Sequence, residues 1–284
     1  MLRSLMIVSI VALAQTAAAQ PCTLLMGYRT TDRLPYIAAA PDNTGLYLDL
    51  YTEASRRIGC QLKIIREPKN RVLDSLKIGR IDFYPGLIFS PERGKDFYFL
   101  PNGLPSQQVA LTRSGLQALN SLQIMRGKTL IMAMGGAYKE AIQHGINVRT
   151  PPELTIEKAI EMIESSKADV YVDELSSLTY YLNHYPNRNK LMLHPNCCGG
   201  VQHFTMGISR QSSNTKYIPN PKFNPYHDVN AENDPLKLAP NSTMSRFSQA
   251  VWQLNKEGFT AKLYKKYYGI DMPTLDEHTP MQSE

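Results

Sequence analysis

The chain has 284 residues, of which 43% are hydrophobic and 20% charged, and its formal net charge is +6. This length allows one large or two modest domains, and the composition is that of a globular protein, not of a disordered chain. The basic residues are scattered and do not alternate with aromatic residues along one stripe, so we expect no nucleic-acid partner.

The N-terminal 19 residues have the three parts of a secretory signal peptide. A basic start with Arg3 precedes the apolar segment 5–14, and Ala17 and Ala19 supply the small residues of a cleavage site. The apolar segment is about half as long as the roughly 20 residues that a membrane-spanning helix needs. We therefore expect residues 1–19 to be removed and the mature protein to be soluble and periplasmic.

Four cysteines are an even number, and disulfides persist in the oxidising compartment that an exported protein reaches. Cys22 and Cys60 each open a strand pattern. If the two strands are parallel neighbours, both cysteines lie at the same edge of the sheet and can pair. Cys197 and Cys198 are adjacent in the sequence and can form a vicinal bridge.

The first part of the chain alternates strand and helix patterns. Strands are expected at 24–28, 62–66 and 81–84, and the helices between them end at Gly59 and Gly79. Strand–helix–strand alternation predicts a parallel sheet with right-handed crossovers.

The same alternation restarts after an extended segment, and the chain closes with two helices. The expected elements are an extended segment at 109–112, strands at 128–134, 169–172 and 204–209, and helices at 156–163, 175–182, 247–254 and 260–268. Residues 211–241 are rich in Asn, Pro and Lys and have no periodicity, which predicts a long loop.

Two sheet units with two connecting strands predict a hinged, two-lobed α/β protein. We expect the first lobe to comprise residues 20–112 and 203–271, the second lobe residues 113–202, and a flexible tail residues 272–284. Ligands of open parallel sheets bind beyond the C-terminal ends of the strands, so the residues that follow each strand are the candidates for a binding site.

Short motifs run in order along most of this length. They are Gly45-Leu46-Tyr47-Leu48-Asp49-Leu50, Leu76-Lys77-Ile78-Gly79-Arg80-Ile81-Asp82, Ser90-Pro91-Glu92-Arg93, Gly135-Gly136-Ala137-Tyr138, Ala168-Asp169-Val170-Tyr171-Val172-Asp173, and the closing segments 254–258 and 264–269. As an ordered set they resemble the periplasmic extracellular solute-binding proteins of family 3, which serve polar amino-acid uptake.

The resemblance implies a type II periplasmic-binding-protein fold, in which each lobe has a mixed, mostly parallel sheet flanked by helices. It implies a monomer that closes over a small-molecule ligand and delivers it to an ABC-type membrane permease, with no cofactor and no catalysis. Hinge bending of this kind buries the ligand between the lobes.

The resemblance also assigns roles to single residues. Arg93 matches the arginine that binds a ligand carboxylate, for which a planar guanidinium with two parallel donors is suited. Asp173 matches the acid that pairs with the ligand's α-ammonium group. The alternatives are that Arg93 is a surface residue at a helix start and that Asp173 caps the helix that follows it.

The anion-binding loops depart from the family pattern. Backbone N–H groups at Gly136 can receive an anion at a helix start, and Tyr138 follows in the same motif. Ala137 lacks the hydroxyl that the family carries there, and Gly86 and Ile88 replace hydroxyl residues on another strand-end loop. These changes argue against a simple α-amino-acid ligand.

Several cations favour an acidic ligand. Lys69 stands where the family has a stacking aromatic residue, and Arg29 stands where binders of cationic amino acids have an acid. With Arg71 and Arg93 they predict charge complementarity to an amino acid or organic acid with an extra negative group. The alternative is that the loop cations are solvated.

Tyrosines complete the candidate site. Tyr28 and Tyr36 are candidate walls, although a tyrosine near a strand end often serves for packing.

Other classes of function have less support. No nucleophile elbow, phosphate-binding loop or zinc-protease motif is present, and Glu174 is the obvious spare carboxylate for a dehydratase-like general acid on this fold. A sensor or accessory subunit of a redox system, docking through residues 211–241, is a further alternative. A soft-metal site at His194, Cys197, Cys198 and His203 is less favoured than a disulfide or packing, so we expect no metal.

Overall fold

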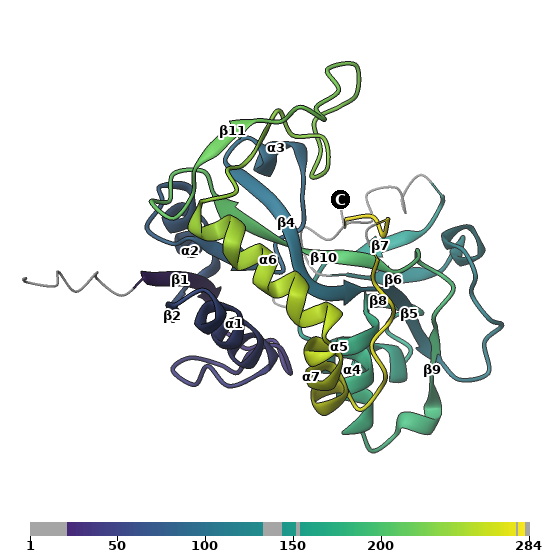
Figure 1. The fold of residues 1–284 in the computed structure, drawn as a ribbon. Coiled ribbons are helices and arrows are strands. Elements are labelled where there is room, and N and C mark those ends of the chain that lie inside the picture. Colours follow the sequence, from purple (N-terminus) through teal and green to yellow (C-terminus); the bar gives the residue numbers. More distant parts are fainter. Residues whose placement is uncertain (1–21, 133–143, 152–153, 277, 282–284) are drawn as a thin grey trace, which may run out of the picture.

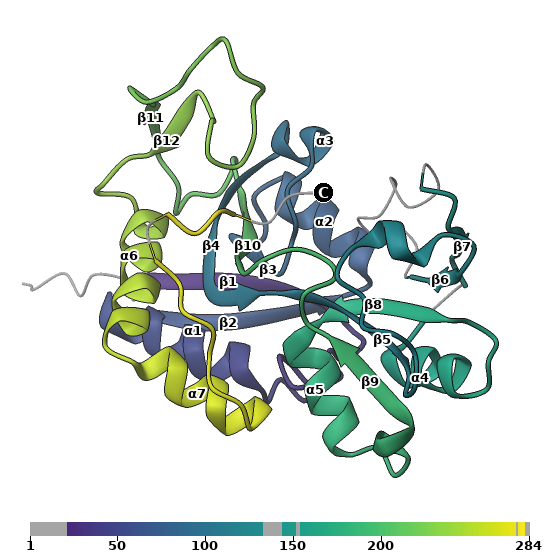
Figure 2. The same ribbon diagram turned by 90° about the vertical axis from the view of Figure 1, so that its right-hand side faces the viewer.

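A computed structural model describes residues 22–132, 144–151, 154–276 and 278–281 of the chain (Figure 1). The expected signal peptide lies outside these residues. Two α/β lobes stand beside each other, each built on its own five-stranded sheet, as Figure 2 shows from the side. The two-lobed α/β fold that the strand and helix patterns predicted is confirmed.

The first lobe contains strand order β2-β1-β3-β10-β4. Its elements are β1 (Cys22–Arg29), α1 (Leu46–Arg57), β2 (Cys60–Glu67), α2 (Lys69–Lys77), β3 (Phe83–Pro85), α3 (Pro91–Gly94), β4 (Phe97–Ser106), β10 (Gln202–Ser209), α6 (Thr243–Lys256) and α7 (Phe259–Tyr268). Strands β1, β2 and β3 are parallel, and β10 runs antiparallel between β3 and β4. The carboxyl ends of β1 and β2 therefore lie at the same edge of the sheet.

The second lobe contains strand order β7-β6-β8-β5-β9. Its elements are β5 (Gln108–Arg113), η1 (Leu122–Met125), β6 (Thr129–Ile131), β7 (Asn147–Arg149), α4 (Ile156–Glu164), β8 (Val170–Glu174), α5 (Leu175–Asn183), η3 (Arg188–Lys190) and β9 (Leu191–His194). Strands β6, β7 and β8 are parallel, whereas β5 is antiparallel to both β8 and β9.

The boundary between the lobes differs from the expected one. We placed residues up to 112 in the first lobe, but β5 pairs with β8 and β9 and belongs to the second sheet. The crossover therefore lies at Gln107, between β4 and β5, and the return runs through residues 195–201, between β9 and β10.

Strands β4, β7 and β9 were absent from the expected elements. Strand β4 contains two prolines and a glycine, which hide its strand pattern. The segment 211–241 is not structureless throughout, because β11 (Tyr217–Pro219) and β12 (Leu236–Leu238) form an antiparallel pair within it. Three residues per strand are too few for an alternating pattern to be recognised.

The C-terminal segment, which we expected to be a flexible tail, lies against the first lobe in the part that the structure describes. The backbone N–H of His203 donates to the carbonyl of Pro280 at 2.7 Å, and Leu275 is buried. The N–H of Met281 donates to the carboxylate of Glu232 at 2.9 Å, so the segment reaches the loop of the β11–β12 pair.

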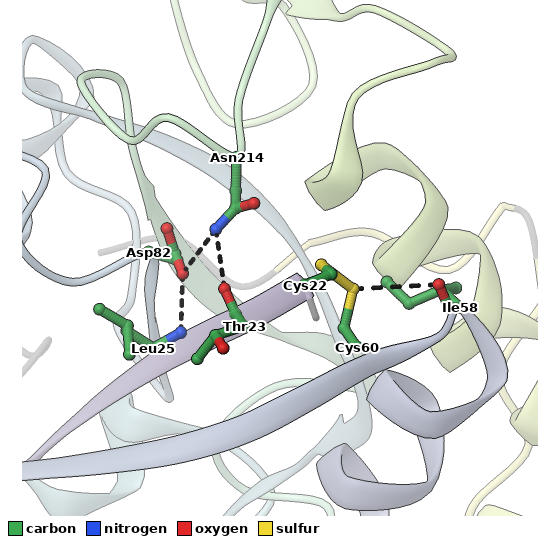
Figure 3. The surroundings of a disulfide bond; sticks show 7 residues. All are labelled: Cys22, Thr23, Leu25, Ile58, Cys60, Asp82 and Asn214. Atoms are coloured by element: carbon green, nitrogen blue, oxygen red, sulfur yellow. Dashed lines mark hydrogen bonds between the residues drawn. A yellow bond between two sulfur atoms is a disulfide. The ribbon is translucent and has the colours of Figure 1, made fainter. Parts of the chain in front are cut away.

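Cys22 and Cys60 are register partners on the parallel strands β1 and β2, and a disulfide joins them. Figure 3 shows the bridge beside Asp82, a buried carboxylate that accepts hydrogen bonds from the backbone of Leu25 at 2.7 Å and from Asn214 at 3.1 Å. The start of the sheet is thus fixed by a covalent bond and by a buried carboxylate.

Cys197 and Cys198 are also joined to each other, in the return segment of the second lobe. Cys197 is buried, and both cysteines pack against the apolar cluster that includes Met125 and Val172. The ring of His194 lies between Thr112 and the backbone of Leu119. Within the described ranges, no three His, Cys, Asp or Glu side chains come together as a metal site.

Candidate functional site

The loop between β1 and α1 reaches across to the second lobe. Arg33 Nη2 lies 3.5 Å from Asp173 Oδ1, and Tyr36 Oη lies 2.9 Å from Ser176 Oγ. Asp173 is in β8, and Ser176 is in the first turn of α5. The residues after β1 therefore meet those at the end of β8, where a ligand of this architecture is expected.

Arg33 is half-buried and held between aromatic rings. Its guanidinium carbon lies 5.6 Å from the ring centroid of Tyr36 and 5.9 Å from that of Phe204. Guanidinium groups at such distances are attracted to the face of an aromatic ring. The two rings and the Asp173 carboxylate together fix the position of this cation.

Asp173 has hydrogen bonds on both carboxylate oxygens. The N–H of Glu174 donates to Oδ1 at 2.7 Å, and the hydroxyl of Tyr171 donates to Oδ2 at 2.5 Å. The cap position of α5 is occupied by Glu174, and it makes no side-chain capping bond. The helix-capping role that we considered for Asp173 is therefore not what the structure shows.

Tyr36 is fully buried and touches both lobes. Burial, reinforced by the charge of Glu174 and opposed by that of Arg33, raises the pKa of Tyr36 to about 12. Its hydroxyl is therefore protonated at neutral pH and can donate to Ser176. The neighbouring side chain of Tyr268 also packs on this ring, with centroids 5.7 Å apart.

The tyrosines form a continuous aromatic cluster under the loop. Tyr28 stacks on Tyr84 with centroids 5.0 Å apart, and Tyr36 stacks on Tyr47 at 5.0 Å. Tyr47 in turn stacks on Tyr51 at 5.5 Å. All five rings are buried. Tyr28 and Tyr36 thus serve for packing, and Tyr36 in addition has a polar contact with the second lobe.

Gly86 lies where a side chain has no room. It has a φ of 73°, and an added Cβ would lie 2.9 Å from Phe204 Cζ and 3.0 Å from Tyr47 Oη. Only glycine adopts this conformation without strain. Gly86 therefore lets Phe204 approach closely, and Phe204 contacts Arg33.

Two arginines lie at the ends of the parallel strands. Arg66 in β2 donates to the carbonyls of Arg29 at 2.9 Å and Ala38 at 2.8 Å and to Asn43 Oδ1 at 2.7 Å. Arg29 donates from Nη2 to the carbonyl of Asp32 at 3.3 Å, but its buried Nε has no hydrogen-bond partner among the residues that the structure describes. Arg66 thus binds the loop, while one polar atom of Arg29 is left unsatisfied.

The remaining sequence-predicted residues are spread more widely. Arg93 lies in α3 and donates to the carbonyl of Ile88 at 2.9 Å. Lys69 and Arg71 are exposed on the first turn of α2. Gly136, Ala137 and Tyr138 lie outside the described residues.

Arg33 and Arg66 were missed in the sequence. Arg66 occupies the carboxyl end of a predicted strand, so the strand-end rule alone was enough to find it. Arg33 stands in the middle of a loop, four residues beyond the end of β1, and no local pattern distinguishes it from a solvated arginine. Its importance depends on Asp173, 140 positions further along the chain.

The chain folds into two lobes on mixed sheets, which are connected by two crossing segments and meet through residues at strand ends. This architecture defines a two-lobed periplasmic-type binding protein. The chain belongs to the bacterial extracellular solute-binding proteins, family 3, whose sequence profile matches residues 26–270. No curated protein sequence matches the chain. In the part of the chain that the structure describes, no helix has the length and apolar character needed to cross a membrane.

Solved structures of binding proteins share the fold. An ancestral arginine-binding protein bound to arginine has a TM-score of 0.61 at 17% identity, over 87% of this chain and 98% of its own. The L-cystine solute receptor of Neisseria gonorrhoeae, unliganded and open, has a TM-score of 0.59 at 17% identity, over 90% and 96%. An ancestral amino acid-binding protein described as a precursor of cyclohexadienyl dehydratase has a TM-score of 0.60 at 16% identity, over 87% and 95%. At these identities the likeness establishes the fold.

Proposed function

We propose that this chain is exported to the periplasm, captures a small anionic ligand between its lobes, and presents it to an ABC-type permease. Membership of an extracellular solute-binding family supports the first and last parts of this proposal. The anionic character of the ligand rests on the arginines at the strand ends of the first lobe.

The single observation that carries the ligand class is the unsatisfied Nε of Arg29. A buried donor without a partner costs about 1–3 kcal/mol, and more when it belongs to a charged group. A ligand carboxylate is the group that satisfies such a donor best, because it accepts charge-assisted hydrogen bonds.

The surrounding charges support the same conclusion. Arg29 ends β1, Arg66 is the register partner of Tyr28 on β2, and Arg33 lies in the loop after β1, so three cations lie near the carboxyl ends of these strands. Their charges oppose the rise that burial causes in the pKa of Tyr84. Asp173 neutralises one of them, and among the described residues neither Arg29 nor Arg66 has an ion-pair partner. An anionic ligand balances this excess, and Arg93 and the loop of Gly136–Tyr138 are proposed to contribute further contacts.

A dehydratase-like enzyme is the second candidate, since one relative by fold is described as a precursor of such an enzyme. Glu174, the carboxylate that we considered for acid catalysis, accepts hydrogen bonds from Ser106 Oγ at 2.8 Å and from the N–H of Gln107 at 3.0 Å. Both of its oxygens are thus engaged at the crossover between the lobes. This engagement favours binding over catalysis.

Native mass spectrometry of protein purified from the periplasm, followed by a thermal-shift screen of amino acids and small organic acids, tests the proposal. We expect a co-purified or stabilising anion, and Arg29→Gln should lower the affinity for it at least tenfold, or about 1.4 kcal/mol. Arg246→Gln, at an exposed position of α6, is the control and should leave the affinity unchanged. Stabilisation by lysine, arginine or neutral amino acids alone would refute an anionic ligand.

A further inference from the structure

We propose that Arg33 is an internal counter-ion for Asp173 and restricts the site to carboxylate ligands that carry no amino group. This inference rests on the proposed function, because it concerns the class of anion that the same site accepts. It predicts that a dicarboxylate binds better than the amino acid that differs from it only by an ammonium group.

The first step is that both carboxylate oxygens of Asp173 already have partners. Its Oδ1 is shared by the guanidinium of Arg33 and the N–H of Glu174, and its Oδ2 accepts from Tyr171. A carboxylate with a cation at one oxygen and neutral donors on both has its charge balanced. An incoming ammonium group would have to displace the guanidinium or share the carboxylate with it.

The second step is that Arg33 is not free to move aside. Its N–H and carbonyl form a reciprocal pair with those of Ile37, at 2.9 and 3.1 Å, so the backbone on both sides of Pro35 is closed into a narrow turn. The rings of Tyr36 and Phe204 hold its guanidinium.

The third step is the attachment of that turn to the first lobe. The N–H of Tyr47 donates to the carbonyl of Tyr36 at 2.9 Å, and an added Cβ at Gly45 would lie 2.5 Å from the same oxygen. The loop therefore packs directly on the start of α1. On its other side Arg66 donates to the carbonyl of Ala38. Arg33 is thus presented by a braced loop and has a defined place in the site.

The fourth step is that the electrostatic field at the strand ends is positive. Arg29 and Arg66 bring two further positive charges to the adjoining carboxyl ends of β1 and β2, and Asp173 is the carboxylate that faces Arg33. An ammonium group next to three guanidinium groups is repelled, and the acid that could offset this repulsion is already paired. Carboxylate groups meet attraction from all three.

Isothermal titration of the full mature chain with matched pairs tests this inference. The probes are succinate with L-aspartate and glutarate with L-glutamate, and the quantity is the ratio of the two dissociation constants within a pair. We expect the unmodified chain to bind the member without the amino group at least tenfold more tightly.

Three variants test whether Arg33 determines this ratio of dissociation constants. Arg33→Gln frees the charge of Asp173 and should shift the ratio at least tenfold toward the amino acid. Arg33→Lys keeps the cation and should preserve the preference, which distinguishes loss of charge from loss of fold. The double variant Arg33→Gln with Asp173→Asn should lose the gain for the amino acid, because the freed carboxylate is gone. Arg57→Gln, which removes an ion-paired arginine from α1, is the control and should leave the ratio unchanged.

The outcomes separate the two proposals. Tight binding of aspartate or glutamate by the unmodified chain, equal to that of the partner acid, overturns the role of Arg33 and leaves an anion-binding protein. The role of Arg33 is also overturned if the Arg33→Gln variant folds and binds but has the same ratio of dissociation constants as the unmodified chain. Failure of all four acids to bind the unmodified chain, with stabilisation by a cationic or neutral solute, overturns the proposed function and this inference with it.

Discussion

Ser106 Oγ donates a hydrogen bond of 2.8 Å to Oε1 of Glu174 and so joins the end of β4 in the first lobe to the end of β8 in the second. The N–H of the next residue, Gln107, donates to the other carboxylate oxygen. Glu174 is buried, and at this crossover the main chain passes between the lobes. The junction is therefore a polar contact that one buried carboxylate makes with two donors.

Glu174→Gln should lower the free energy of unfolding by about 1–3 kcal/mol. The amide offers one acceptor oxygen in place of two, so one of the two donors loses its partner in a buried site. Urea unfolding monitored by circular dichroism measures the change. Ser106→Ala removes one donor and leaves the carboxylate bound to Gln107, so its effect should be smaller. A change below about 0.5 kcal/mol in Glu174→Gln would show that this contact is dispensable.

The Cys22–Cys60 disulfide should contribute about 2–4 kcal/mol to the free energy of unfolding, because it restricts the unfolded chain across a sequence separation of 38. The double variant Cys22→Ser with Cys60→Ser should lose this amount in chemical denaturation. Peptide mapping without reduction is the direct measurement and should recover the two cysteines in one linked peptide pair. Free thiols at both positions, or a link from Cys60 to Cys197, would contradict it.

Arg66→Ala should destabilise the loop between β1 and α1. The guanidinium donates to several loop carbonyls and to Asn43, and hydrogen bonds to charged groups contribute about 1.5–3 kcal/mol. We expect a loss of about 2–3 kcal/mol of unfolding free energy and faster amide hydrogen exchange across residues 30–44. Arg56→Ala on α1, whose side chain is 71% exposed, is the control and should leave stability nearly unchanged, because exposed ion pairs contribute little. Unaltered exchange in the loop would argue against the bracing role.

His194 should make stability depend on pH. Burial lowers its pKa, and the neutral ring accepts from the N–H of Leu119 at Nδ1 while Nε2 donates to Thr112. The unfolded chain, with a histidine pKa of about 6.5, binds the proton more readily. The contribution is therefore complete above about pH 6.5 and is lost as the pH falls from there through the lower pKa of the folded protein.

The contribution of His194 to stability is measured by denaturation of the unmodified chain and of His194→Asn at several pH values between 5 and 8. Asparagine can still accept from Leu119 but does not titrate. The stability difference between the two proteins should be largest near pH 8 and should shrink toward pH 5. A difference that is constant over this range would show that His194 does not titrate between the two states.

Arg93→Ala should weaken ligand binding by at least about 2 kcal/mol if Arg93 binds a ligand carboxylate, as is typical when one partner of a buried charge pair is removed. Arg93→Lys keeps the charge but cannot form two parallel hydrogen bonds, so its effect should be intermediate. Calorimetry with the anion identified in the ligand screen measures both. Unchanged affinity in Arg93→Ala would remove this residue from the site.

The sequence alone indicated the alternation of strands and helices in both lobes. Helical spacing marked α1, α4 and α6, because an amphipathic helix shows its buried face in a window of a dozen residues, and glycines marked the ends of α1 and α2. The placement of Cys22 and Cys60 at matched strand starts indicated the bridge that the structure forms. These inferences depend on local periodicity or on the rule that parallel neighbours share an edge.

The tertiary structure alone decided which polar groups meet. Arg33 and Asp173 are 140 positions apart, and Ser106 and Glu174 are 68 apart, so neither pair leaves a pattern in the sequence. The short strands of the second lobe, such as β7, also escaped detection, since three residues cannot show an alternating pattern. Local sequence specifies local conformation through backbone and side-chain preferences. The pairing of charges across the lobes depends on where the folded sheets place their strand ends. This placement makes Arg33, a residue of the chain itself, the counter-ion of Asp173.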